Sequence, residues 1–255
     1  MKLFSLKISS LSMAIGISLS TLAPIASADT VFGIYAGGGK WTSDYSGEAG
    51  EPAVTTQQLG LKDSDNTFFY IAIEHPVPVL PNVKYTHQTI QSDQTATLTE
   101  TFGLDDTIFT ASTEVYSDFD LSSNDITLYY ELLDNWVNID LGITARQYDG
   151  YLLAEAESLN ERERVELDVT IPLIYGKFQF DLPLSGLSLA VETNFIKYEE
   201  NKLMDYTAKI AYLFDSVLDV GVEAGYRKLS LKVDDDETQA DLDLDGPYIG
   251  AMLHF

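Results

Sequence analysis

The chain has 255 residues, of which 45% are hydrophobic and 22% charged, so it can bury a sizeable core. Fifteen Lys and Arg stand against 40 Asp and Glu, and the formal net charge of −25 excludes nucleic acid as a partner. The chain has no cysteine, which excludes disulfides, thiolate metal sites and cysteine nucleophiles.

The first 28 residues have the pattern of a secretory signal peptide. Lys2 and Lys7 form a basic start, residues 8–25 are apolar with small hydroxyl residues, and Ala26-Ser27-Ala28 has the small-residue pattern of a cleavage site. A retained membrane anchor is the alternative, but the serine-rich middle favours cleavage. We predict cleavage after Ala28 and one exported domain over residues 29–255.

Beyond the leader, hydrophobic residues recur with a period of two, which is typical of β-strands. The clearest example is the segment 137–146, in which every second residue is apolar. The alternation predicts about ten strands, near residues 30–41, 67–75, 82–91, 122–132, 136–147, 165–181, 187–198, 203–214, 217–232 and 239–255. Segments 54–62 and 94–117 either form hairpins in the loops or add two strands, and eight or twelve strands are the alternatives.

This alternation fits a soluble barrel or sandwich, or a membrane barrel with its apolar faces toward lipid. Glycines on the polar faces and aromatic residues near the strand ends, such as Trp136 and Tyr212, favour the membrane barrel. Short turns also alternate with longer loops, near 42–66 and 148–164 among others, as in barrels whose loops face outside. We predict an all-β, antiparallel up-and-down transmembrane β-barrel in the cell outer membrane.

The end of the chain favours the same location. Ile249, Ala251, Leu253 and Phe255 form one apolar face that is closed by a terminal aromatic residue. This ending resembles the recognition signal of bacterial outer-membrane barrels. It predicts the barrel assembly machinery as a partner during biogenesis, with membrane lipid and lipopolysaccharide as partners afterwards.

The apolar residues change parity within the last two predicted strands. Leu244 has an even number, whereas the apolar residues from Ile249 onward have odd numbers. Two interpretations stay open. The strands contain bulges near Gly246-Pro247 and Arg227-Lys228, or their upper parts form a sheet with reversed facing.

Four segments of the chain resemble a known protein family. They are Asp29–Gly39, Phe68–Asn82, Tyr129–Asn135 and Gly246–Phe255. They are similar to segments of a family of small Gram-negative outer-membrane β-barrel proteins without an assigned function. Because these motifs mark strands and turns, the resemblance implies fold and location and carries over no catalytic residue.

The polar strand faces place charges of both signs in the predicted lumen. These are Glu74, Asp125, Glu131, Asp140, Glu192, Asp205, Asp219 and Glu223, with Lys84, Arg146, Lys177, Lys209 and Arg227. Side chains largely fill a barrel of about ten strands, and an unpaired charge there would be costly. We therefore predict a paired network in a plugged lumen, and a structural or surface-interaction role. A small channel for hydrophobic or cationic solutes is the first alternative.

An outer-membrane enzyme is the second alternative, but we predict no catalytic residue. His87 falls on the apolar face of its strand, and the sequence indicates no Ser or Asp partner for it. Asp234, Asp235, Asp236 and Glu237 are candidate metal ligands, which could hold Ca²⁺ or Mg²⁺ weakly and bridge to lipopolysaccharide phosphates. The alternative for this acidic run is a solvated loop. Apart from such weak ion binding, we expect no cofactor.

Overall fold

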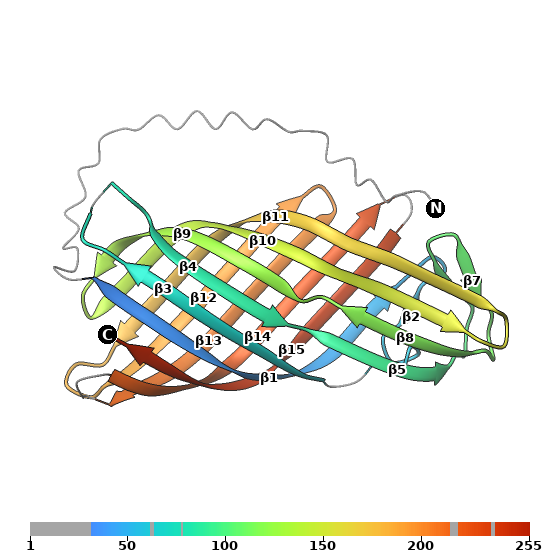
Figure 1. Cartoon of the computed structure of the whole chain (residues 1–255), viewed down its shortest axis with the longest axis horizontal. Helices are drawn as coiled ribbons and strands as arrows, with labels where there is room; N and C mark the ends of the chain where they lie inside the picture. Colours follow the sequence, from blue (N-terminus) through green and yellow to red (C-terminus); the bar gives the residue numbers. More distant parts are fainter. Residues whose placement is uncertain (1–31, 62–63, 78, 215–218, 236–237) are drawn as a thin grey trace.

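The structure is a computed structural model that describes residues 32–61, 64–77, 79–214, 219–235 and 238–255. The predicted signal peptide over residues 1–28 lies outside the described residues. The described part of the chain folds as β-structure throughout (Figure 1). None of its segments forms a helix that is long and apolar enough to cross a membrane.

Ten long antiparallel strands close into a barrel, as the sequence predicts. They are β1 (Gly33–Ala49), β3 (Ser64–Glu74), β4 (Asn82–Thr89), β9 (Ser123–Asp134), β10 (Val137–Ala156), β11 (Glu161–Asp181), β12 (Leu187–Tyr198), β13 (Asn201–Phe214), β14 (Asp219–Asp235) and β15 (Thr238–His254). Each strand pairs with the next in this order, and β15 pairs with β1 to close the ring. The alternatives of eight and twelve strands are therefore wrong.

The remaining strands extend the wall of the barrel at one end. β5 (Gln91–Thr97) and β8 (Glu114–Asp120) continue the β4–β9 pair in the same register, and β8 also pairs with β10. A hairpin of β6 (Phe102–Leu104) and β7 (Thr107–Phe109) lies between them, and β2 (Val54–Thr55) pairs with β1. The described residues of segments 54–62 and 94–117 thus lie in loop structure and add no strand to the barrel.

The two ends of the barrel differ in their connections (Figure 1). At one end, which we call the turn end, β3–β4, β9–β10 and β11–β12 are joined by short turns, and Ile34 donates a backbone hydrogen bond to Phe255. The opposite end, the loop end, carries β2 and β5–β8. Much of the length predicted as loop is strand there, because β10 and β11 stay paired as far as Ala156 and Glu161.

The apolar face of the barrel wall changes from the outside to the inside along the strands. Toward the turn end, large apolar side chains are exposed on the outer face. This outer belt comprises Ile71, Ile73, Ile126, Leu128, Leu141, Ile143, Ile174, Phe178, Leu189, Val191, Ile210, Val220, Val222 and Ile249. Toward the loop end, the apolar side chains point inward and form the loop-end core, which comprises Trp41, Tyr45, Leu59, Leu61, Ile90, Phe102, Leu104, Phe119, Leu121, Tyr148, Leu173, Leu203, Leu229, Leu244 and Tyr248.

This exchange explains the parity change in the last two strands without any bulge. β14 and β15 pair in one unbroken register from Asp219 opposite His254 to Asp235 opposite Thr238. Leu229 and Leu244 are partners in that register, and each is only 2% exposed. The bulges predicted near Gly246-Pro247 and Arg227-Lys228 are therefore wrong, and the interpretation of reversed facing is correct. The strand stays regular while its apolar face passes from the outside to the inside.

Candidate functional site

A chain of buried ion pairs crosses the interior of the barrel. Arg146 on β10 donates hydrogen bonds to Asp125 on β9, 2.9 Å from Nε and 2.7 Å from Nη2, and to Asp205 on β13 at 2.8 Å. Arg227 on β14 donates to both carboxylate oxygens of Asp205, at 2.9 and 2.6 Å, and to Gln88 on β4. Strands that do not pair in the wall, such as β10 and β13, are thereby joined through the interior.

A second group of ion pairs surrounds Tyr70 on β3. Lys84 pairs with Glu192 on β12 at 2.5 Å, and Lys209 pairs with Glu223 on β14 at 2.9 Å. The two lysine ammonium groups lie 5.3 and 5.6 Å from the centroid of the Tyr70 ring. Each lysine therefore has both a carboxylate and an aromatic face to stabilise its charge.

The third group of polar side chains lies nearest the turn end. Lys177 pairs with the fully buried Asp140 at 3.2 Å, and the hydroxyl of Tyr129 donates to Glu74 at 2.7 Å. Glu131 accepts a hydrogen bond of 3.1 Å from a side-chain amide on β4. The structure thus brings twelve of the thirteen charges that the sequence assigned to the lumen into three groups, each containing acids and at least one base. Asp219 is the exception, and its carboxylate lies 3.8 Å from His254 Nδ1 at the turn end.

Several interior aromatic residues were missed by the sequence analysis. Tyr70, Tyr129 and Tyr175 project between the ion pairs, and Tyr129 and Tyr175 are each 2% exposed. The parity of Tyr70 could have placed it in the interior, because an even number of positions separates it from the inward Glu74 on the same strand. Gly37 gives Tyr70 its space, since a Cβ there would lie 2.6 Å from the tyrosine ring.

A polar cavity of about 80 Å³ remains among these side chains. Its walls include Lys84, Arg146, Glu192, Lys209 and Glu223, all of which already take part in ion pairs. The polar walls can provide hydrogen-bond partners for a few water molecules.

Trp41 and Tyr248 mark the boundary between the polar interior and the loop-end core. Trp41 is 1% exposed and donates from Nε1 to the carbonyl oxygen of Gly246 at 3.2 Å. The guanidinium of Arg227 lies 4.6 Å from the Trp41 ring centroid, which is a cation–π geometry. The indole thus faces the last charge of the network on one side and belongs to the apolar core on the other.

Tyr45 in the loop-end core has a shifted pKa. Burial raises the pKa of the Tyr45 phenol, and the nearby polar side chains of Ser64, Ser43 and Asn66 offset this only in part. Because burial disfavours the phenolate, Tyr45 keeps its proton at neutral pH and remains a potential hydrogen-bond donor.

The three histidines lie apart from one another and contact no serine hydroxyl within hydrogen-bond distance in the described part of the chain. His75 Nε2 lies 3.2 Å from the carbonyl oxygen of Pro81, and His87 Nδ1 lies 2.9 Å from Asn124 Oδ1. His254 stacks on a tyrosine of β1, with 4.2 Å between the ring centroids. His87 lies opposite the exposed Phe69 on the outer face of the barrel, as its parity predicts.

The structure describes two of the four predicted metal ligands, Asp234 and Asp235. Asp234 is exposed on β14, and its backbone N–H donates to Asn201 Oδ1 at 2.8 Å. Asp235 belongs to the same strand, and Asp236 and Glu237 lie outside the described residues. Among the residues that are described, no cluster of three or more potential ligands could hold a metal ion.

The predicted membrane-insertion signal forms one continuous face. Its residues are Ile249, Ala251, Leu253 and Phe255, and all four are exposed on the outer side of β15 or at the chain end that follows it. They continue the outer belt down to the turn end.

No model of a known protein family matches this chain, and no curated protein matches it significantly.

Proposed function

We propose that this protein is an outer-membrane β-barrel with a structural or surface-interaction role and a lumen closed by its own side chains. The observation that carries the proposal is the reversal of the barrel wall. Over the turn-end half, apolar side chains are outside and ion pairs are inside. A barrel in water has no physical reason to expose an apolar ring, whereas a barrel in lipid requires one.

The outer belt supports the membrane location. The belt surrounds most of the barrel, because its members lie on eight of the ten barrel strands: β3, β9, β10, β11, β12, β13, β14 and β15. Exposed aromatic residues lie at its turn-end border, including Trp136 at 59% and Phe214 at 51%. Such residues occupy membrane–water interfaces in barrels of this kind. The resemblance to the small outer-membrane barrel family agrees with this location.

The interior supports a closed lumen. Arg146, Asp205 and Arg227 bridge it with hydrogen bonds shorter than 3 Å, and the cavity that remains beside them is about 80 Å³. Beyond this layer the loop-end core begins at Trp41. A permeating ion would have to pass both a paired charge network and an apolar layer, and each opposes its passage.

The proposed partners of the barrel are lipids and the assembly machinery. Outer-membrane lipid and lipopolysaccharide would contact the belt, and the assembly machinery would recognise the face from Ile249 to Phe255. We assign no enzymatic reaction and no cofactor.

Cell fractionation combined with gel electrophoresis tests the location. We expect the protein in the outer membrane, extracted only by detergent, with a shift in gel mobility on boiling because the closed barrel resists the detergent until heated. Recovery in the soluble periplasmic fraction without a shift would overturn the membrane proposal.

Planar bilayer recordings test the closed lumen. We expect no conductance steps from the wild-type protein and none from Arg227→Ala, because the loop-end core still closes the path. Regular cation-selective steps from the wild type would overturn the closed lumen and establish the channel alternative.

A further inference from the structure

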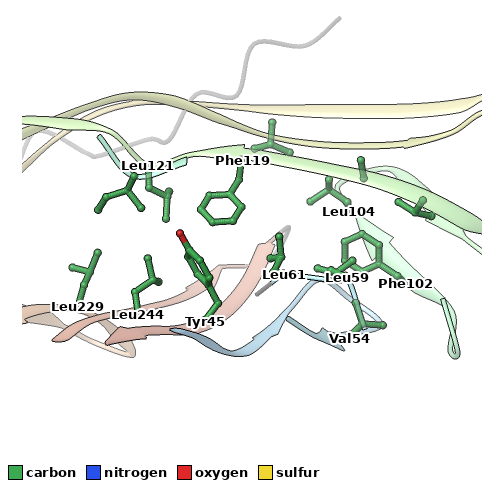
Figure 2. Packing of buried hydrophobic residues seen from close by; sticks show 14 of the residues in the cluster. Tyr45, Val54, Leu59, Leu61, Phe102, Leu104, Phe119, Leu121, Leu229 and Leu244 are labelled. Carbon is green, nitrogen blue, oxygen red and sulfur yellow. The ribbon is translucent and has the colours of Figure 1, made fainter. Parts of the chain in front are cut away.

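The loop-end core contains a second cavity. It has about the same volume as the polar one, but its lining is mostly apolar. It has a volume of about 80 Å³ and lies between the walls formed by β1, β8, β10 and β15 and the segment 56–61. Figure 2 shows side chains of Tyr45, Leu61, Leu104, Phe119 and Leu244 converging on this region from opposite walls. None of these residues takes part in the ion-pair network described above.

An apolar cavity inside a packed core is unfavourable when empty and is a poor site for water. Its lining loses dispersion contacts, and water needs two to four polar partners to be held there. A cavity of about 150 Å³ with such a lining binds benzene. A cavity of about 80 Å³ is suited to a guest smaller than benzene, such as a molecule with two or three carbon atoms.

Two buried hydroxyls on the cavity wall have no hydrogen-bond partner within the described chain. They are Tyr45 Oη and Ser117 Oγ, on residues that are 6% and 7% exposed. Tyr45 lies near Ser43, Ser64 and Asn66 but forms a hydrogen bond of ordinary geometry with none of them. A buried hydroxyl without a partner is costly, so a ligand that supplies one would be bound more tightly.

We propose that the loop-end cavity is a binding site for one small neutral molecule with a slender hydrocarbon body and a single hydroxyl or carbonyl group. The hydrocarbon occupies the space among Leu61, Leu104, Phe119 and Leu244, and the polar group pairs with Ser117 or Tyr45. The site depends on the fold of the loop end alone. It therefore holds whether the barrel resides in a membrane or in water.

Leucine-methyl NMR of the full folded chain tests the site, with 1-propanol and xenon as probes. We expect saturable shifts of Leu61, Leu104 and Leu244. Leu141 and Leu189 on the outer belt serve as internal references, because they report the partitioning of either probe into detergent or lipid around the barrel. Shifts confined to the belt leucines, or shifts that never saturate, would overturn the proposal.

Two substitutions of Ser117 separate the roles of shape and hydrogen bonding. Ser117→Leu fills the cavity and should abolish the saturable shifts for both probes. Ser117→Ala leaves the space open and should weaken the binding of 1-propanol roughly three- to tenfold, while xenon binds as before.

The matched control is Thr95→Leu, which adds similar bulk on the exposed face of β5 in the same sheet. It should leave both titrations unchanged. If Ser117→Leu does not fold, the Ser117→Ala titration still decides the matter, because equal weakening of both probes or none at all would contradict the assigned hydrogen bond. Retained binding in a folded Ser117→Leu would show that the probes bind elsewhere.

Discussion

The turn-end and loop-end halves of this barrel are built from the same strands but have opposite interiors. In the turn-end half, charges such as Arg146 and Asp205 are buried and leucines are exposed. In the loop-end half, Leu229 and Leu244 are buried, while the outward Lys228 pairs with Asp243 at the surface. The loop-end half thus has the side-chain distribution of a water-soluble protein, and the turn-end half has the reverse. The level of Trp41 and Tyr248, where the two meet, is where the surroundings of the barrel should change.

The largest expected effect comes from breaking the charge network of the turn-end half. Arg146→Met removes the guanidinium that joins Asp125 to Asp205, which leaves the buried Asp125 without its ion-pair partner while Asp205 keeps Arg227. The free energy of unfolding should fall by about 3–5 kcal/mol, as for other buried ion pairs that lose one member. Urea unfolding in detergent or lipid vesicles, followed by tryptophan fluorescence, measures the change.

An exposed ion pair provides the control for this substitution. Lys40 and Asp65 lie 3.4 Å apart with side chains that are 65% and 61% exposed. Lys40→Met should have little measurable effect, because solvent screens such pairs. Equal effects of the two substitutions would mean that the interior charges are hydrated as well as those at the surface.

The loop-end half should respond to the loss of apolar volume instead. Leu244→Ala removes a side chain that is 2% exposed in the loop-end core and should cost about 2–5 kcal/mol of unfolding free energy. Leu141→Ala is the matched change in the outer belt, where the side chain is 50% exposed, and should cost much less. The same unfolding assay compares them, and a larger loss for Leu141→Ala would contradict the division into two halves.

The period-two alternation was sufficient to predict the ten strands, because inward and outward positions alternate whatever surrounds the barrel. It was not sufficient to decide what the parity change at Leu244 meant. A bulge and a change of surroundings leave the same pattern in one strand, and only the unbroken pairing of β14 with β15 distinguishes them.

The extent of the strands and the partners inside the barrel depend on long-range contacts. β10 continues past Gly150 because β8 returns to pair with it, with Tyr151 opposite Asp120. Parity placed both Arg146 and Asp205 in the lumen, but their meeting depends on the stagger of strands 59 residues apart in sequence. Local pattern carries no information on that stagger. The loop-end cavity also depends on the packing of segment 56–61 against distant strands, and no local pattern in the sequence indicates it.

The surroundings of the outer belt can be tested with a charge. Ile143 is 63% exposed and pairs with Leu128 and Ile174 in the middle of the belt. If lipid surrounds it, Ile143→Arg should cost about 2–4 kcal/mol in vesicles. Gln147→Arg, on the same face of β10 but nearer the loop end, should cost clearly less. If both variants unfold at the same urea concentration as the wild type, the belt does not lie in lipid.

The smallest effect concerns a glycine in the turn-end half. A Cβ at Gly37 would lie 2.6 Å from the Tyr70 ring, which is held between the ammonium groups of Lys84 and Lys209. Gly37→Ala should therefore cost about 1–3 kcal/mol, because the ring cannot move without disturbing these charges. Gly176→Ala is the control, since its Cβ would meet its nearest neighbours at an ordinary 3.7 Å. Combining Gly37→Ala with Tyr70→Phe should not relieve the loss, because the ring itself occupies the space. Full recovery in the double variant would show that the hydroxyl near Glu223, and not the ring, sets the limit.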